Sequence, residues 1–232
     1  MFTAEGIDIR RILLTAPPLL LSLTIHEYSH ARMALFFGDP TAKYNGRLTL
    51  NPLRHLDPIG TLMLLFSGVM GWAKPVPVNP FNLHPIRLGQ VMVSLAGPLS
   101  NLSLAVLSGL GLRAWLAWAP AHHAAYETVH VLLWYTAAAN VGLCFFNLIP
   151  LFPLDGHHIA RELLPVRRQQ GFMQWQMRFG AFILIVLLIG PRLIETVTRR
   201  QMPYDPLGLV LSHVITPVLN VIIYWTPGAP GA

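Results

Sequence analysis

Charged side chains are scarce in this chain of 232 residues, where Asp, Glu, Lys and Arg together make up 11%. Soluble domains carry about 25% of these residues. Hydrophobic residues make up 53%. Because so few charges cannot cover an ordinary water-facing surface, this composition excludes a typical soluble domain and predicts an integral membrane protein.

Cysteine is scarce as well, and internal repeats are absent. Cys144 is the single cysteine, so an intrachain disulfide is excluded. The net charge of +6 comes from basic residues that stand singly or in pairs between apolar runs. This distribution lacks the basic stripe of a nucleic-acid-binding protein, so we expect no nucleic-acid partner. It fits loop residues that orient a protein in a bilayer.

Long apolar runs supply the elements that such a protein needs. We expect a helix over 12–37, a second over 88–118, a third within 129–158 that ends in a broken segment, and C-terminal helices within 179–225. The shorter apolar stretch 59–71 favours a re-entrant piece. The sequence therefore predicts an all-α polytopic membrane protein, a bundle of about 5–6 transmembrane or re-entrant helices, with residues 1–232 as a single domain.

The segment 39–87 between the first two long helices has a different character. Asn45-Gly46 lies between partly alternating residues and is typical of a tight hairpin. Prolines alternate with valines over 75–78, which favours an extended, edge-like segment. We therefore expect a small membrane-associated insert with a β-hairpin or extended strands. A plain polar loop is the alternative, because the flanking strands would be short.

The first long helix contains the pattern His26-Glu27-x-x-His30. The two histidines are one helical turn apart, so both imidazoles point to the same side, and Glu27 could reach a water bound between them. This spacing supplies two zinc ligands and a general base. Each ionisable group in the middle of a spanning helix costs about 2.5–3.5 kcal/mol on insertion scales, which favours a functional role. The alternative is that the three side chains only satisfy one another in a packed bundle.

A catalytic zinc takes three protein ligands and keeps one position open, so a third ligand is needed. Pro150 and Pro153 must break the helix that precedes Asp155, and broken backbone at membrane depth is tolerated where it lines a cavity. Asp155 could bind the metal, or it could only cap a following helix over 159–164. His157 and His158 compete with it, because imidazole suits zinc as well. Local chemistry does not choose among the three.

Five motifs follow one another along the chain: His26-Glu27-x-x-His30, Gly-Arg-Leu-Thr-Leu-Asn-Pro at 46–52, Gly-Trp-Ala-Lys-Pro-Val-Pro-Val at 71–78, Ala-Gly-Pro-Leu-Ser-Asn at 96–101 and Asn-Leu-Ile-Pro-Leu-Phe-Pro-Leu-Asp-Gly at 147–156. In this order they resemble the site-2 protease family of intramembrane zinc metalloproteases. The resemblance extends over roughly residues 10–165. We expect a short form of the family, without a PDZ domain or a C-terminal nucleotide-sensing domain.

The resemblance assigns roles that local chemistry leaves open. It implies that Asp155 is the third ligand of one zinc ion per chain. It also implies that Asn147 lies near the metal in a supporting role, where its amide N–H could stabilise an oxyanion. The implied activity is an intramembrane endopeptidase in which Glu27 is the general base and a transmembrane protein is the substrate.

A helical substrate must unwind before it is cut, and it could then bind extended along exposed backbone by β-augmentation. The candidate residues for this contact are Leu48, Thr49, Leu50, Val76 and Val78. We expect a multi-pass protein in the lipid bilayer of a prokaryotic plasma membrane, and the sequence predicts no particular oligomeric state. The alternative is a zinc transporter or sensor that does not cleave. A transporter needs ligands along a pathway and often has repeats, whereas this sequence has one cluster and no repeat.

Overall fold

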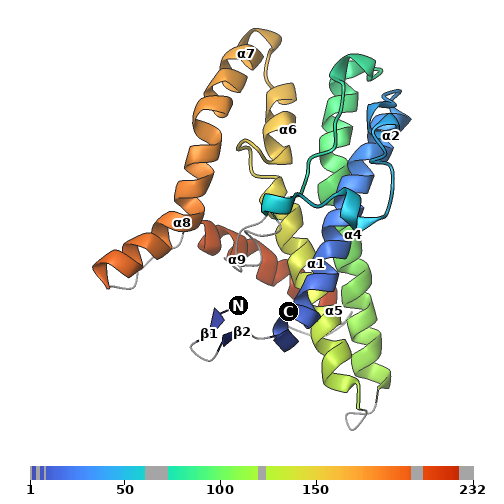
Figure 1. Ribbon diagram of the computed structural model, residues 1–232, viewed down its shortest axis with the longest axis vertical. Helices are drawn as coiled ribbons and strands as arrows, with labels where there is room; N and C mark the ends of the chain where they lie inside the picture. Colours follow the sequence, from blue (N-terminus) through green and yellow to red (C-terminus); the bar gives the residue numbers. More distant parts are fainter. Residues whose placement is uncertain are drawn as a thin grey trace, which may run out of the picture.

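The computed structural model describes residues 2–3, 6–7, 9–60, 73–119, 124–199 and 206–224. Its centre is a bundle of three long helices, α1 (Ile9–Phe36), α4 (Ile86–Trp118) and α5 (Tyr126–Asn147), which pack side by side (Figure 1). The shorter elements are the antiparallel strands β1 (Phe2–Thr3) and β2 (Gly6–Ile7), the helices α2 (Thr41–Tyr44), α6 (Asp155–Leu163), α7 (Val166–Trp175), α8 (Ala181–Thr198) and α9 (Pro206–Leu219), the 3-10 turns η1 (Pro52–Arg54) and η2 (Pro80–Asn82), and the π-helical turns η3 (Gln176–Gly180) and η4 (Asn220–Tyr224).

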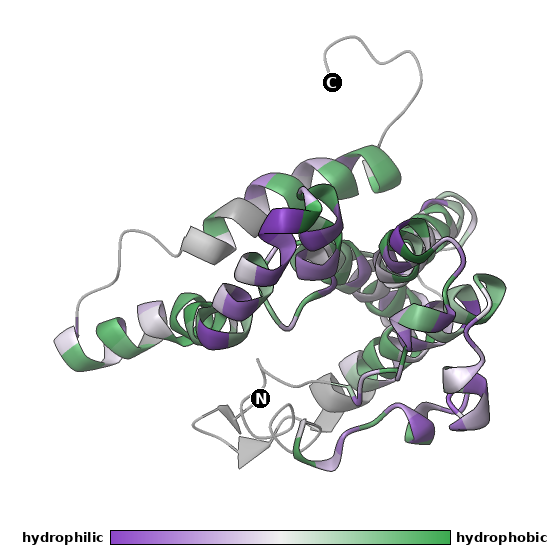
Figure 2. Ribbon diagram, turned by 90° about the horizontal axis from the view of Figure 1, so that it is seen from above, coloured by the Kyte–Doolittle hydropathy of each residue, from purple (hydrophilic) through white to green (hydrophobic). Residues whose placement is uncertain are grey.

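Three helical stretches of the described chain are long and apolar enough to cross a membrane: Ile86–Trp118, Tyr126–Asn147 and Val166–Thr198. The last of these combines α7, η3 and α8, and it stands apart from the central bundle, with α6 between them (Figure 1). Figure 2 shows that hydrophobic ribbon dominates the long helices, while hydrophilic ribbon gathers in shorter helices and connections. The predicted all-α class of a membrane protein is confirmed.

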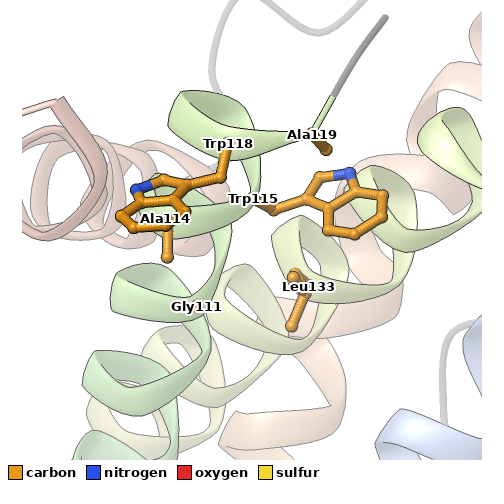
Figure 3. Close-up of a pocket in the computed structure, with 6 residues that line it drawn as sticks. All are labelled: Gly111, Ala114, Trp115, Trp118, Ala119 and Leu133. Carbon is orange, nitrogen blue, oxygen red and sulfur yellow. The ribbon is translucent and has the colours of Figure 1, made fainter. Parts of the chain in front are cut away.

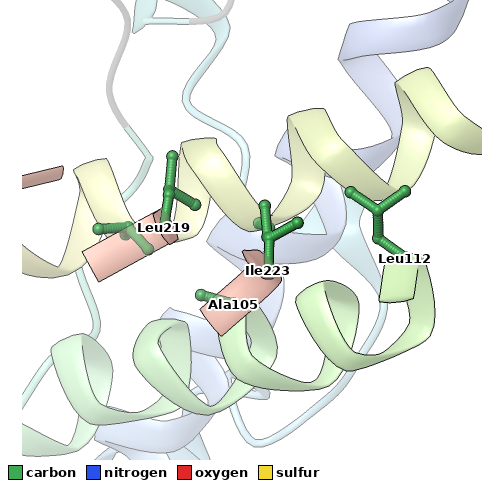
Figure 4. Close-up of a cluster of buried hydrophobic side chains, with 6 residues drawn as sticks. Ala105, Leu112, Leu219 and Ile223 are labelled. Atoms are coloured by element: carbon green, nitrogen blue, oxygen red, sulfur yellow. The ribbon is translucent and has the colours of Figure 1, made fainter. Parts of the chain in front are cut away.

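The C-terminal helix closes the central bundle through an apolar core. Ala105 and Leu112 of α4, Ala137 and Val141 of α5, and Leu219 and Ile223 at the C-terminal end are all buried together, four of them labelled in Figure 4. A Cβ atom at Gly109 would lie 2.2 Å from Cγ2 of Ile222. The absence of a side chain at Gly109 therefore permits the close approach of η4 to α4.

The predicted β-hairpin of the insert is not seen. Thr41–Tyr44 forms the short helix α2 instead, and Gly46 adopts φ +65° directly after it. The N–H of Gly46 donates to the carbonyl of Lys43, and the N–H of Arg47 donates to that of Ala42. This pair of bonds is a Schellman C-cap. The positive φ expected of Asn-Gly is thus used to end a helix, and the hairpin prediction was wrong.

Asp39 fastens the insert to the end of α1. Its buried carboxylate accepts hydrogen bonds from the N–H and hydroxyl of Thr41, at 3.1 and 2.5 Å, from the N–H of Asn79 at 2.7 Å and from the amide of Asn82 at 3.0 Å. Burial alone raises the pKa of this carboxyl, but these four donors outweigh it and lower the pKa below its ordinary value. The two ends of the insert are therefore tied to one ionised group.

Several helix boundaries differ from the predicted ones. The first helix begins at Ile9, before residue 12, and the first of the C-terminal helices predicted within 179–225 belongs to the much longer stretch Val166–Thr198. Most of the stretch predicted as re-entrant, 61–71, lies outside the described residues, as does residue 225 at the predicted end of the last helix.

Candidate metal centre

The two histidines of α1 meet the first residue of α6. Nε2 of His26 lies 3.2 Å from Oδ2 of Asp155, and Nε2 of His30 lies 3.4 Å from Oδ1. The two Nε2 atoms are 3.0 Å apart. One ligand atom from each of the three residues can be chosen so that all lie within 4.8 Å of one another. Residues 125 positions apart in the sequence thus form one cluster, and it includes Asp155, the residue to which the resemblance assigns the role of third ligand.

The hydrogen bonds of the two Nδ1 atoms show which nitrogen of each imidazole is available to a metal. Nδ1 of His26 lies 2.6 Å from Oδ1 of Asn101, and Nδ1 of His30 lies 2.7 Å from the carbonyl oxygen of Val93. Both partners are acceptors, so each Nδ1 carries a proton, and each Nε2 offers a lone pair when its ring is neutral. Oδ2 of Asp155 is buried and has no hydrogen-bond partner. Two imidazoles and a carboxylate that converge in this way fit a zinc ion.

A buried polar network holds the ring of His26 in place. The amide of Asn101 on α4 donates to Oδ1 of Asn140 at 2.7 Å, and the amide of Asn140 on α5 donates to the hydroxyl of Ser22 at 2.7 Å. Ser22 lies one turn before His26 on α1, so the chain of bonds returns to its own helix. All three side chains are buried. The network joins the three central helices behind one ligand and fixes its tautomer.

Gly97 of α4 lets the two imidazoles lie against the helix. A Cβ atom there would be 2.4 Å from Nε2 of His30 and 2.6 Å from Cε1 of His26. Any side chain would therefore occupy the space of the ligands. The glycine of the motif at 96–101 is explained by this contact.

Asp155 is presented by a short helix that is anchored to α4. Its carboxylate faces the imidazoles, and no side-chain hydrogen bond caps α6 at the preceding residue, so capping does not explain Asp155. Nε of Arg87 on α4 donates to the carbonyl of Glu162 at 2.6 Å. A Cβ atom at Gly156 would lie 2.3 Å from the carbonyl oxygen of Leu148, so this glycine permits the chain to fold back on itself.

The two histidines that compete with Asp155 are placed differently. His157 donates its Nδ1 proton to the carbonyl of Leu154 at 2.5 Å, and its buried Nε2 has no partner. His158 is exposed. Neither belongs to the group of possible metal ligands found among the described residues.

Glu27 is buried beside the cluster, and its negative charge acts on Arg47, a cation that was not predicted as a site residue. Within the described part of the chain, no residue donates a hydrogen bond to the Glu27 carboxylate, which leaves it available as a proton acceptor. Arg47 is buried and donates to the carbonyl of Lys74. Burial lowers the pKa of Arg47, and the negative charge of Glu27 opposes that lowering. The presence of an arginine in the motif at 46–52 was the only hint in the sequence of this charge interaction between Arg47 and Glu27.

The other predicted site residues do not join the cluster. The amide of Asn147 donates to the carbonyl of Leu143 in its own helix at 2.9 Å. Leu48, Thr49 and Leu50 lie in an irregular segment, where the carbonyl of Thr49 accepts from Nε2 of His55 at 2.8 Å. Val76 and Val78 lie in an irregular stretch before η2, and their backbone N–H groups donate to no residue that the structure describes.

A separate cavity of about 380 Å³ lies towards the other end of α4. It is lined by Gly111, Ala114, Trp115, Trp118, Ala119 and Leu133 (Figure 3). The first of these is 14 residues beyond Gly97, a rise of about 21 Å along the helix. Its lining is apolar apart from the indole N–H groups, so it is not the centre of the chemistry.

Comparisons with known proteins identify relatives of this chain. A model described as Peptidase family M50 matches residues 115–189, the part of the chain that carries Asp155. The chain is 42% identical to "Putative zinc metalloprotease YwhC" of Bacillus subtilis over 205 residues, which cover 87% of this chain and 84% of that protein. It is 38% identical to "Putative zinc metalloprotease Rip2" of Mycolicibacterium smegmatis and 31% identical to that of Mycobacterium tuberculosis, over 75% of this chain and 66% of each relative. No solved structure matches the chain.

Proposed function

Since this chain belongs to peptidase family M50, the site-2 protease family, we propose that it hydrolyses peptide bonds within or next to transmembrane segments of other membrane proteins. The family is one of membrane metalloproteases, and the cofactor is zinc. We propose in addition where the substrate is cut and which residues take part.

The observation that carries this proposal is the depth of the cluster along α4. This helix has 33 residues, a length of about 50 Å, and its central residue is 102. Gly97, which touches both imidazoles, is five residues or about 8 Å from that centre. The hydrocarbon core of a bilayer extends about 15 Å to each side of its midplane. If α4 spans the bilayer centrally, the ligands lie inside the hydrocarbon region, where only a membrane-embedded segment can reach them.

The residues of the chain divide the proposed reaction between them. His26, His30 and Asp155 would hold the zinc, which when bound lowers the pKa of water towards about 7 and polarises a carbonyl. Glu27 would take a proton from the attacking water and give it to the leaving amine. Asn147 would stabilise the developing oxyanion, for which its amide must turn away from Leu143.

Val76 and Val78, whose backbone N–H groups donate to no described residue, are the better of the two candidate contacts for an unwound substrate. Pro75 and Pro77 carry no N–H, so alternate residues of this segment can pair with an added strand. The segment 48–50 is less suited, because the carbonyl of Thr49 already accepts from His55.

The test is to reconstitute the purified protein with single-span membrane proteins and to locate any cut by mass spectrometry. We expect cleavage inside or within a few residues of the apolar segment, lost on zinc chelation and restored by added zinc. Cleavage confined to soluble loops would contradict the intramembrane assignment while leaving the metalloprotease intact.

A further inference from the structure

A buried glutamine far from the sequence motifs contacts the loop that carries the third ligand. Gln176 is the first residue of the π-helical turn η3 and is only 1% exposed. Its Oε1 accepts from the N–H of Phe152 at 2.9 Å, and its amide donates to the carbonyl of Pro150 at 2.7 Å. One side chain thus satisfies a backbone donor and a backbone acceptor of the same loop.

The bond to Phe152 completes the pairing of the N–H groups of the loop. Pro150 and Pro153 have no N–H, and the N–H groups of Leu151 and Leu154 donate to carbonyls within the loop, those of Ile149 and Leu151. The N–H of Phe152 has Gln176 as its partner. Both bonds of Gln176 are partly buried, and backbone groups that are sheltered from water are costly to leave unpaired. The conformation that aims Asp155 therefore depends on an element outside the loop.

The backbone around Gln176 is built for this contact. A Cβ atom at Gly180 would lie 2.7 Å from Oε1 of Gln176 and 3.0 Å from both the backbone nitrogen and Cβ of Phe152. The missing side chain therefore makes room for the loop beside the helix. A π-helical turn interrupts an otherwise continuous helical stretch at this point, and such turns frequently occur at functional sites.

We propose that Gln176 is a positioning residue for the metal centre, which sets the zinc affinity by holding the loop before Asp155. The proposal rests on the proposed zinc site, and it assigns a role to the stretch Val166–Thr198 that is otherwise exposed on most of its apolar surface. Gln176 touches neither a ligand atom nor the substrate. It acts on the centre through the backbone of residues 150–152.

The primary test compares Gln176→Met with Gln174→Met. Methionine has nearly the volume of glutamine and cannot replace either hydrogen bond, while Gln174 is an exposed glutamine two residues away. Zinc affinity is measured on the full chain in detergent by competition with a chromophoric chelator. We expect Gln176→Met to weaken zinc binding about 10–100-fold, the usual loss for a partner outside the ligand shell, and Gln174→Met to bind as the parent does.

A second pair of variants tests the same contact from the backbone side. Gly180→Ala should also weaken zinc binding, whereas Gly171→Ala should not, because a Cβ atom at Gly171 meets nothing within 4 Å. Thermal unfolding of the metal-free proteins separates positioning from general stability. Parental zinc affinity in Gln176→Met and Gly180→Ala, with or without a lower melting temperature, would overturn the proposal.

The readout also separates this proposal from the proposed protease activity. If the parent binds zinc but cuts no membrane segment, the affinity comparison still decides the role of Gln176. If the parent binds no zinc, both proposals are wrong.

Discussion

Nδ1 of His26 and Nδ1 of His30 each donate a hydrogen bond to an oxygen of α4. Because the protons are on the Nδ1 atoms, the Nε2 atoms of the two rings are the ones that face Asp155. The two Nε2 atoms lie 3.0 Å apart beside the Asp155 carboxylate, at 3.2 and 3.4 Å from its oxygens. A divalent ion between them would interact favourably with all three side chains at once. Zinc binding is therefore expected to stabilise the fold as well as to supply the chemistry.

Glu27→Gln should keep zinc and lose cleavage. The amide has the same shape but cannot accept the proton, and general base catalysis contributes about 10²–10⁴-fold to a rate. Metal content is measured by atomic emission and cleavage by gel on the same samples. Glu127→Gln, at an exposed glutamate on α5, is the matched control and should behave as the parent. Undiminished proteolysis in Glu27→Gln would remove Glu27 from the mechanism.

Asp155→Ala should lose zinc and activity together, because it removes one of the three converging side chains that could hold the metal. His157→Ala and His158→Ala should each keep zinc. His157 uses its Nδ1 proton to hold the carbonyl of Leu154, so a modest loss of affinity is expected for that variant alone. Zinc retained without Asp155 but lost without His157 would reverse the assignment of the third ligand.

Gly97→Ala should abolish zinc binding although alanine is a better helix former than glycine. The added methyl would occupy the space of the His30 and His26 rings. Gly111→Ala on the same helix is the control, since its Cβ would lie 3.6 Å from Leu133, an ordinary contact. The measurement is the zinc content of purified Gly97→Ala compared with that of purified Gly111→Ala. Equal zinc in both would show that the rings can move without losing the metal.

At the scale of elements, the sequence predicts those structures that follow from a local pattern. The long helices follow from apolar runs, and the pairing of His26 with His30 follows from helical spacing. The structure of the insert could not be predicted from its local pattern, because Asn-Gly can supply a positive φ either to a hairpin or to the C-cap of a helix. The contacts of Gln176 and Arg47 could not be predicted either, since each joins a residue to a backbone carbonyl 26 or 27 positions away.

The insert provides a prediction about pH. Burial raises the pKa of Asp39, but the hydrogen-bond donors around it lower the pKa by more than burial raises it. The net result is a pKa below the unfolded value of about 3.9. The ionised group therefore stabilises the fold above about pH 4, and this contribution is lost as the pH falls through the lowered pKa. Asp39→Asn should cost about 1–3 kcal/mol at neutral pH, because an amide nitrogen cannot accept from the N–H of Asn79.

The measurement is unfolding of the metal-free parent and Asp39→Asn in detergent, between pH 7 and pH 3. The difference between the two proteins should be constant at the upper end and shrink towards acid pH. A difference that stays constant throughout would show that Asp39 is not ionised in the folded protein.

At the scale of the whole molecule, the depth of the metal centre depends on how α4 lies in the bilayer. Its two ends carry exposed residues, Leu88 and Trp118, which are separated by about 45 Å of helix. Leu107 lies between them and is 66% exposed on the surface of the protein. If α4 spans a bilayer about 30 Å thick centrally, its two ends would project into water while Leu107 would face hydrocarbon.

The natural sequence suits a labelling test of this placement, because Cys144 is its single cysteine and is buried. In a Cys144→Ser background, Leu88→Cys and Trp118→Cys should react with a membrane-impermeant maleimide from opposite sides of sealed vesicles. Leu107→Cys should stay unlabelled until the vesicles are dissolved in a denaturing detergent. Since Gly97 lies between residues 88 and 107 on the same helix, this pattern would put the imidazoles below the membrane surface. Ready labelling of Leu107→Cys in intact vesicles would instead mean that α4 does not span centrally, and the substrate would then have to be sought outside the bilayer.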